Sequence, residues 1–152
     1  MPNYRLPNES SLNAMVAMII DEDAESEQHE APEDIKASHV GVFQDAAGAV
    51  VAQCACDFEL AASVGCALSM IPPNTASDMA KSGDLTDMAR QNLYEVMNMF
   101  SSLFMDDNSD HLKLVEVVEA ASAEEMGGDT KTVTFTLNGG KYAGGKLSFT
   151  VQ

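Results

Sequence analysis

A long amphipathic segment between residues 85 and 104 constrains the fold of this chain most strongly. Its apolar residues recur at the spacing of one helical face. Asp84 and Asp87 stand where the helix would begin, as capping residues whose acidic groups suit the positive end of the helix dipole. The residues on the apolar side are Leu85, Ala89, Leu93, Val96, Phe100, Leu103 and Phe104. A helix with one apolar face needs another layer to cover that face, and we expect this layer to be a β-sheet.

The opposite side of the same helix is polar. Asp87, Gln91, Glu95, Asn98 and Ser102 fall within an arc of about 80° on a helical wheel. Glu95 and Asn98 are three positions apart, so their side chains are neighbours on the helix surface. Asn92 falls near the edge of the apolar face, where a buried hydrogen-bonding role is more typical than a functional one.

The rest of the chain predicts strands that are grouped along the sequence and helices that are segregated from them. We expect helices at 11–20 (with Ser10 or Ser11 as the N-cap), at 59–70 and at 75–81, the last ending at Gly83. We expect strands at 39–45, 49–58, 112–119, 132–137 and 146–151, with turns at 46–48 and at the Gly-rich run before residue 146. This order indicates an α+β fold with a largely antiparallel sheet.

Composition excludes several classes of function. The chain has 152 residues, 24 acidic and 8 basic, for a net charge of -16, and 45% of its residues are hydrophobic. That size suits one domain spanning 1–152, and the charge disfavours nucleic acids and anionic membranes. The longest apolar run, 14–20, is too short to span a bilayer, and the first residues do not resemble a secretory signal. An odd number of cysteines, three, favours a reducing cytoplasm over a disulfide framework.

Much of the negative charge lies in one stretch. Residues 21–34 contain eight carboxylates, one proline and no lysine or arginine. We interpret 21–37 as a solvated, mobile loop, because like charges repel and no apolar period is present. A surface connector is the simpler reading, and an acidic docking tail is the alternative.

The run from Gly83 to Met99 resembles the signature helix of the CheC/CheX/FliY chemotaxis phosphatases, in which a Glu-x-x-Asn motif is followed by an apolar residue. Glu95 and Asn98 occupy the motif positions. The order of the predicted elements agrees with that family across most of the chain. A single motif is similar to CheX, whereas CheC-type members usually carry two. Two features depart from the pattern: serines stand at 101 and 102, where a glycine is common, and residues 92–94 are Asn-Leu-Tyr.

This resemblance implies a CheC/CheX-like fold and a phosphatase of phosphorylated response-regulator receiver domains. Asn98 would orient the attacking water, because a carboxamide both donates and accepts hydrogen bonds. Glu95 would form a salt bridge with a lysine of the partner. The family resemblance also implies a homodimer with no cofactor of its own, since the receiver supplies the Mg²⁺. From the wheel alone, Gln91 and Ser102 are candidate partner contacts. A non-catalytic binding or dimerisation module of the same fold is the alternative function.

Other patterns do not indicate sites. Residues 140–146 fit the start of a phosphate-binding loop but lack its Ser or Thr and the following helix, so a hairpin turn is the better interpretation. Cys54 and Cys56 lack the further ligands of a metal site, and we predict none. His29, His39 and His111 lie far apart in the sequence, without a catalytic partner motif.

Overall fold

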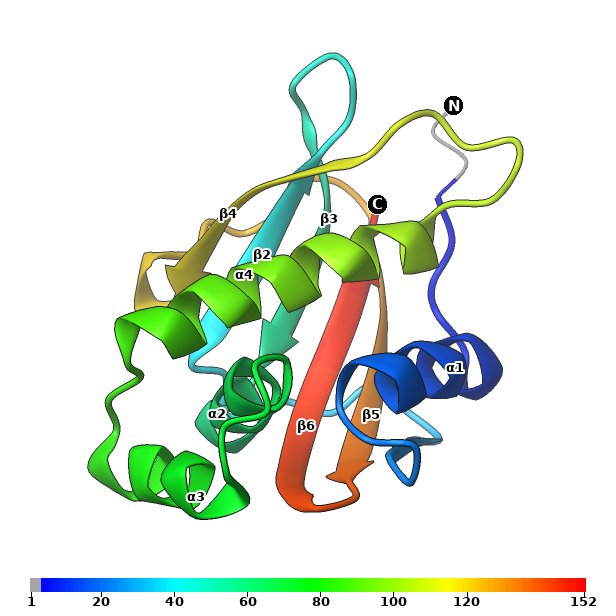
Figure 1. The fold of residues 1–152 in the computed structure, drawn as a ribbon. Helices are drawn as coiled ribbons and strands as arrows, with labels where there is room; N and C mark the ends of the chain where they lie inside the picture. The colour runs from blue at the N-terminus through cyan, green and yellow to red at the C-terminus, as the bar shows by residue number, and fades with distance from the viewer. Residues whose placement is uncertain (1–3) are drawn as a thin grey trace.

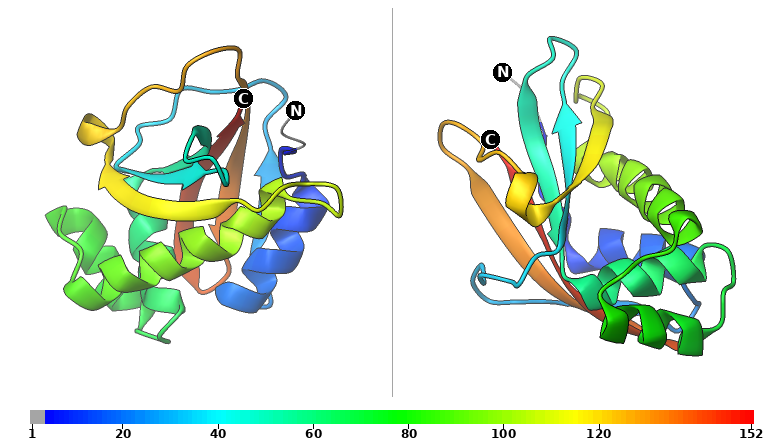
Figure 2. Two further views of the ribbon diagram at one scale, coloured as in Figure 1. Left: turned by 90° about the horizontal axis from the view of Figure 1, so that it is seen from above. Right: turned by 90° about the vertical axis from the view of Figure 1, so that its left-hand side faces the viewer.

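An antiparallel sheet of six strands, in the order β1-β5-β6-β3-β2-β4, lies at the centre of the fold. The structure is a computed structural model, and it describes residues 4–152. The strands are β1 (Glu25–Gln28), β2 (His39–Gln44), β3 (Val50–Cys56), β4 (Lys113–Glu119), β5 (Lys131–Gly139) and β6 (Tyr142–Val151). Figures 1 and 2 show the α-helices together on one face of this sheet. The predicted α+β class and antiparallel sheet are confirmed.

The predicted long helix forms, but it is divided. The helix α4 (Asp87–Phe100) is continued by a short 3₁₀ helix, η1 (Ser101–Phe104), and all seven residues of the predicted apolar face are buried. The N-cap is Thr86, whose hydroxyl accepts a hydrogen bond from the amide of Ala89 at 3.2 Å. The prediction of capping by the two flanking aspartates is therefore wrong, although Asp87 does lie in the first turn.

An aromatic cluster fixes α4 and η1 against the sheet. The ring of Phe149 on β6 lies 5.7 Å from that of Phe100, 5.7 Å from that of Phe104 and 5.9 Å from that of Phe135, measured between centroids. All three contacts have the edge-to-face geometry that aromatic pairs prefer. This cluster joins the helical layer to β5 and β6.

A second contact brings α4 close to α2 (Phe58–Ala67). A Cβ atom placed on Gly65 would lie only 2.7 Å from the carbonyl oxygen of Ala89, so the two helix backbones approach directly at this point. Half-buried Asn92 donates hydrogen bonds from its amide nitrogen to the carbonyl of Gly65 and the hydroxyl of Ser69, both at 2.8 Å. The predicted structural role of Asn92 is confirmed.

The remaining helices form near their predicted positions. The helix α1 (Glu9–Ile19) is capped by Asn8 in a capping box with Ser11, so the predicted serine N-cap is wrong. The helix α3 (Pro73–Ser82) starts at a proline and ends at Gly83, whose φ of 75° lies in the left-handed region. The helix α2 ends at Ala67, three residues earlier than predicted.

The acidic stretch contains a strand, which corrects the predicted loop at 21–37. Strand β1 pairs with β5, with Glu25 opposite Asn138 and Gln28 opposite Phe135. Residues 29–38, the crossover segment, then run across the face of the sheet that the helices leave uncovered (Figure 2). This path takes the chain from the β1 edge to β2 on the far side of β3.

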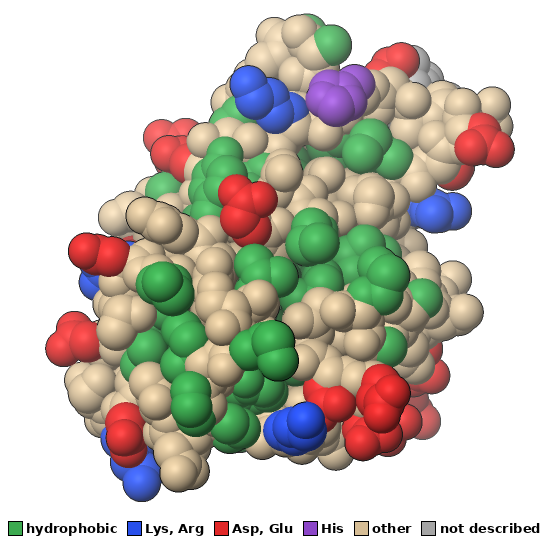
Figure 3. All heavy atoms as spheres, in the orientation of Figure 1, with side chains coloured by type: hydrophobic (Ala, Val, Ile, Leu, Met, Phe, Trp, Pro, Cys, Tyr) green, Lys and Arg blue, Asp and Glu red, His purple; other side chains and the backbone are tan. Residues whose placement is uncertain are grey.

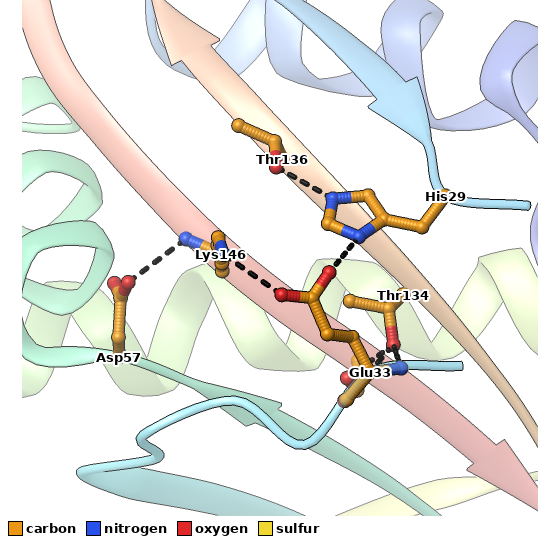
Figure 4. Close-up of polar contacts among 7 residues, drawn as sticks. His29, Glu33, Asp57, Thr134, Thr136 and Lys146 are labelled. Atoms are coloured by element: carbon orange, nitrogen blue, oxygen red, sulfur yellow. Dashed lines mark hydrogen bonds and ion pairs between the residues drawn. The ribbon is translucent and has the colours of Figure 1, made fainter. Parts of the chain in front are cut away.

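Polar contacts attach the crossover segment to β5 and β6 (Figure 4). The imidazole of His29 contacts the carboxylate of Glu33 and lies 2.6 Å from the hydroxyl of Thr136. The second oxygen of Glu33 pairs with the ammonium of Lys146 at 3.1 Å. The backbone amide of Glu33 donates to the hydroxyl of buried Thr134 at 3.0 Å. Lys146 and His29 together hold the pKa of Glu33 below its usual value.

The cysteines are buried, as predicted, and the predicted hairpin forms with a shorter turn than the Gly-rich run before residue 146. Strands β5 and β6 form a hairpin whose turn lies at Gly140 and Lys141, and the glycines at 144 and 145 lie within β6. All three cysteines are free and buried, and burial raises the pKa of the Cys56 thiol.

Candidate functional site

The outer face of α4 presents the four predicted site residues to solvent. Gln91, Glu95, Asn98 and Ser102 are all exposed, the first three on α4 and Ser102 on η1. Neither the carboxylate of Glu95 nor the carboxamide of Asn98 forms a hydrogen bond or ion pair with any residue in the range 4–152. Both groups are therefore available to a partner molecule.

Burial of the opposite face makes α4 a rigid support for these side chains. Leu93, Val96, Met97 and Phe100 are each no more than 2% exposed. Because a packed helix positions its exposed side chains more accurately than a loop does, the Glu95 and Asn98 backbones are fixed relative to each other and to the sheet.

Beside Glu95 the surface is hollowed. Gln91, Asn92, Tyr94 and Glu95 line an open hollow of about 330 Å³. Two of its walls are anchored: Asn92 through its bonds to the α2 end, and Tyr94 through a 3.4 Å hydrogen bond from its hydroxyl to the carbonyl of Leu114. Tyr94 is not among the predicted site residues, although it stands directly before the motif glutamate in the sequence.

The two serines after the motif act on the backbone. The hydroxyl of Ser101 donates to the carbonyl of Asn98 at 2.6 Å, and that of Ser102 donates to the carbonyl of Met99 at 3.0 Å. Both carbonyls also accept the backbone amide of Ser101, so the two hydroxyls add a further hydrogen bond to each carbonyl at the end of the helix. The serines stand at positions where the CheC/CheX/FliY family commonly has a glycine. Their hydroxyl groups stabilise the turn from α4 into η1.

A second hollow lies on the other side of Tyr94. Its volume is also about 330 Å³, and it is lined by His39, Arg90, Leu93, Tyr94, Val117 and Glu119. Burial lowers the pKa of His39; the carboxylate of Glu119 opposes this shift, and the guanidinium of Arg90 adds to it. The imidazole is therefore favoured in its neutral form.

Among residues 4–152 no three His, Cys, Asp or Glu side chains are grouped as a metal site. In the same range, no helix has the length and apolar character needed to cross a membrane.

Comparisons with known proteins find relatives in structure only. No family profile matches the sequence, and no curated protein matches it. A chain of the FliM–SpeE complex from H. pylori aligns with a TM-score of 0.69 and 9% identity over 94% of this chain and 80% of that one. FliY from Thermotoga maritima aligns at 0.64 and 13% identity over 92% and 81%. The CheX–CheY–BeF₃–Mg²⁺ complex from Borrelia burgdorferi aligns at 0.58 and 15% identity over 91% and 89%.

These similarities establish the fold. The chain has the α+β architecture of CheX, FliY and the FliM middle domain, and the matches cover nearly all of it. The fold that the Glu-x-x-Asn resemblance implied is therefore confirmed by structure.

Proposed function

We propose that this chain is a chemotaxis-type protein that binds phosphorylated response-regulator receiver domains and hydrolyses their aspartyl phosphate. The observation that carries the proposal is the pair Glu95 and Asn98, exposed and without partners in the described chain, on a helix whose other face is buried. The fold shared with CheX, which has been solved in complex with CheY, and with FliY supports the same class of partner.

The chemistry needs little from the phosphatase beyond positioning. A water attacks the phosphorus, the bond between phosphorus and the aspartyl oxygen breaks, and the aspartate leaves as a carboxylate. The proton lost by the water ends on the phosphate product. Asn98 can accept a hydrogen bond from this water and donate one to a phosphoryl oxygen, which places the water in line. The Mg²⁺ belongs to the receiver domain, where it balances the phosphoryl charge.

Glu95 supplies the second part of the site. Its carboxylate, at the edge of the hollow beside Tyr94, can form a charge-assisted bond with a lysine of the receiver and so fix the register of the complex. Gln91 and Ser102 lie on the same exposed face and serve in this proposal as contacts to the partner.

The decay of a phosphorylated cognate receiver domain, with and without this protein, tests the proposal. Asn98→Ala should lower the stimulated decay rate by about a hundredfold, because one positioning group is lost. Glu95→Ala should act mainly on binding. Asn74→Ala, an exposed helical asparagine on α3, is the matched control and should leave the rate unchanged. Decay rates that are equal for all three variants and the wild type would end the catalytic proposal.

A second function, a non-catalytic docking module, is supported by a different observation. Structures of FliM in complexes with SpeE and with FliG, both from H. pylori, share this fold. In that case the receiver or another protein would bind with an affinity that Asn98→Ala leaves unchanged, and phosphate would decay at its intrinsic rate.

The homodimer that the CheX resemblance implied stays a prediction, as does a cytoplasmic location. Light scattering on the purified chain measures the first: a mass near twice 16.2 kDa is expected.

A further inference from the structure

The large exposed hydrophobic side chains of this protein are concentrated near the candidate site. Within residues 4–152 there are five of them: Met18, Met70, Met88, Tyr94 and Met99. Three lie on α4, and Met70 lies on the loop that follows α2. Only Met18, on α1, lies on another helix. Figure 3 shows apolar side chains over the middle of the helical face, with one acidic side chain among them and the other acidic side chains mostly toward its rim.

Two of these methionines are in line with the motif glutamate. Met88 comes seven residues before Glu95, and Met99 comes four residues after it. At 100° per residue all three side chains project within about 40° of one another. Met88 is 54% exposed and Met99 is 41% exposed, so Glu95 has an accessible apolar side chain on each side along the helix.

Met70, on the loop that follows α2, is linked to the same surface through its neighbour Ser69. The side chain of its neighbour Ser69 is hydrogen-bonded to Asn92, one turn of α4 away from Met88 and from Glu95. The backbone of Met70 has a φ of 57°, which is unfavourable for a side chain other than glycine. Hydrogen bonds from the amides of Met70 to Ala67 and of Ile71 to Cys66 fix this turn. A side chain that is 88% exposed is thus presented by an ordered, strained backbone.

The charge of this surface differs from that of the whole chain. The chain carries a net charge of -16, but Glu95 is the one acidic residue in the segment of sequence from Met88 to Met99. The carboxylate of nearby Asp87 forms an ion pair with the guanidinium of Arg90, with 3.9 Å between the oxygen and the nitrogen. A partner that is apolar around a single cationic group is complementary to such a surface, and long-range attraction contributes little to its binding.

We propose that Met70, Met88 and Met99 form an apolar collar around Glu95, and that this collar strengthens the binding of the receiver domain. This inference rests on the proposed function above. Methionine suits the role because its unbranched, polarizable side chain adapts to a partner surface at low steric cost. The carboxylate at the centre selects the partner's lysine, and the surrounding methyl groups exclude water from that pair.

The test uses the full chain with [¹³C]methyl-labelled methionine and a receiver domain activated with beryllofluoride and Mg²⁺. The spectrum contains the ten methionines of the chain, and single Met→Gln variants assign the relevant signals. We expect the signals of Met70, Met88 and Met99 to shift or broaden on titration while that of Met18 stays in place. Met88→Gln and Met99→Gln should each weaken binding by about fivefold or more, and Met18→Gln should not change it.

The possible outcomes separate the two proposals. Binding by the wild type, with collar signals unmoved or with Gln variants that bind equally tightly, overturns the collar and leaves the proposed function standing. If no methionine signal changes with any receiver and phosphate decay is not accelerated, the proposed function fails and the collar fails with it. Thermal unfolding of each variant, expected to match the wild type because these side chains are exposed, excludes misfolding as the cause.

Discussion

Gly65→Ala tests the packing that positions the candidate site. The added Cβ would lie 2.7 Å from the carbonyl oxygen of Ala89 and 3.1 Å from its Cβ. The first contact is with backbone, so no side-chain rotation can relieve it. Helices α2 and α4 would have to separate by about half an ångström, which is the kind of overpacking that costs about 1–3 kcal/mol.

Helix propensity acts in the opposite direction. Alanine is favoured over glycine inside a helix by about 0.5–1 kcal/mol. The net expectation is a loss of about 1 kcal/mol in the free energy of unfolding, and up to about 2 kcal/mol if the surrounding helices relax poorly. Urea unfolding followed by circular dichroism measures the change as a lower midpoint with an unchanged slope.

Whether Gly65→Ala lowers or raises the free energy of unfolding shows which of the two effects, overpacking or helix propensity, is larger. A variant that is more stable by the propensity gain alone would show that the helices do not approach at this point. Gly127→Ala is the matched control, because a Cβ there meets nothing within 4 Å and no positive φ is involved. It should stay within about 0.5 kcal/mol of the wild type. Since α4 carries Asn98, Gly65→Ala should also lower the rate at which the protein stimulates the decay of a phosphorylated receiver.

Three further outcomes are expected. Asn92→Ala removes two hydrogen bonds from the α2–α4 contact and should lower the free energy of unfolding by about 1–2 kcal/mol, measured by urea unfolding. Phe149→Ala removes the ring that three other aromatic residues contact and should cost about 3–5 kcal/mol in the same assay. Because Lys146 and His29 lower the pKa of Glu33, this residue stabilises the fold above the usual glutamate pKa, and the contribution is lost as the pH falls through the lowered value. Glu33→Gln should therefore lower the melting temperature near neutral pH and less in acid; an equal loss at every pH would contradict this origin.

The sequence predicted those elements whose signal is repeated along the chain. The apolar period of α4 extends over several turns, so its buried and exposed faces were assigned correctly. Its N-cap was not assigned correctly, because Asp84, Thr86 and Asp87 are all residue types that cap helices. The choice among them depends on where the backbone leaves the extended conformation after Gly83, which no side-chain pattern records.

Strand β1 was missed for a different physical reason. Its four residues, Glu25 to Gln28, include no apolar side chain, and only Ser26 is buried. The strand is stabilised by backbone pairing with β5, more than a hundred residues away, and by hydrogen bonds from the amides of Ser26 and Gln28 to side chains of α1. The interaction of Glu33 with Lys146 is equally distant, so charge repulsion within the acidic stretch was the only effect visible in the sequence.

The candidate site was predicted in part. Spacing on the wheel placed Glu95 and Asn98 on the exposed face, and both side chains lie there. The exposure of Met70 could not be predicted, because it follows from the early end of α2 at Ala67 and from a left-handed turn.

The pairing of β1 with β5 also affects how the chain folds as it is synthesised. The edge strand near residue 25 has no partner strand until residue 138 has been made, and such distant pairings form late because a long loop must close first. During this interval the acidic stretch lacks its partner strand, and the bonds from the amides of Ser26 and Gln28 to side chains of α1 are the contacts within its reach. Its repelling, well-hydrated carboxylates keep it from joining other nascent strands. We therefore expect β1 and the crossover segment to be the last parts of the sheet to gain protection in pulsed hydrogen exchange.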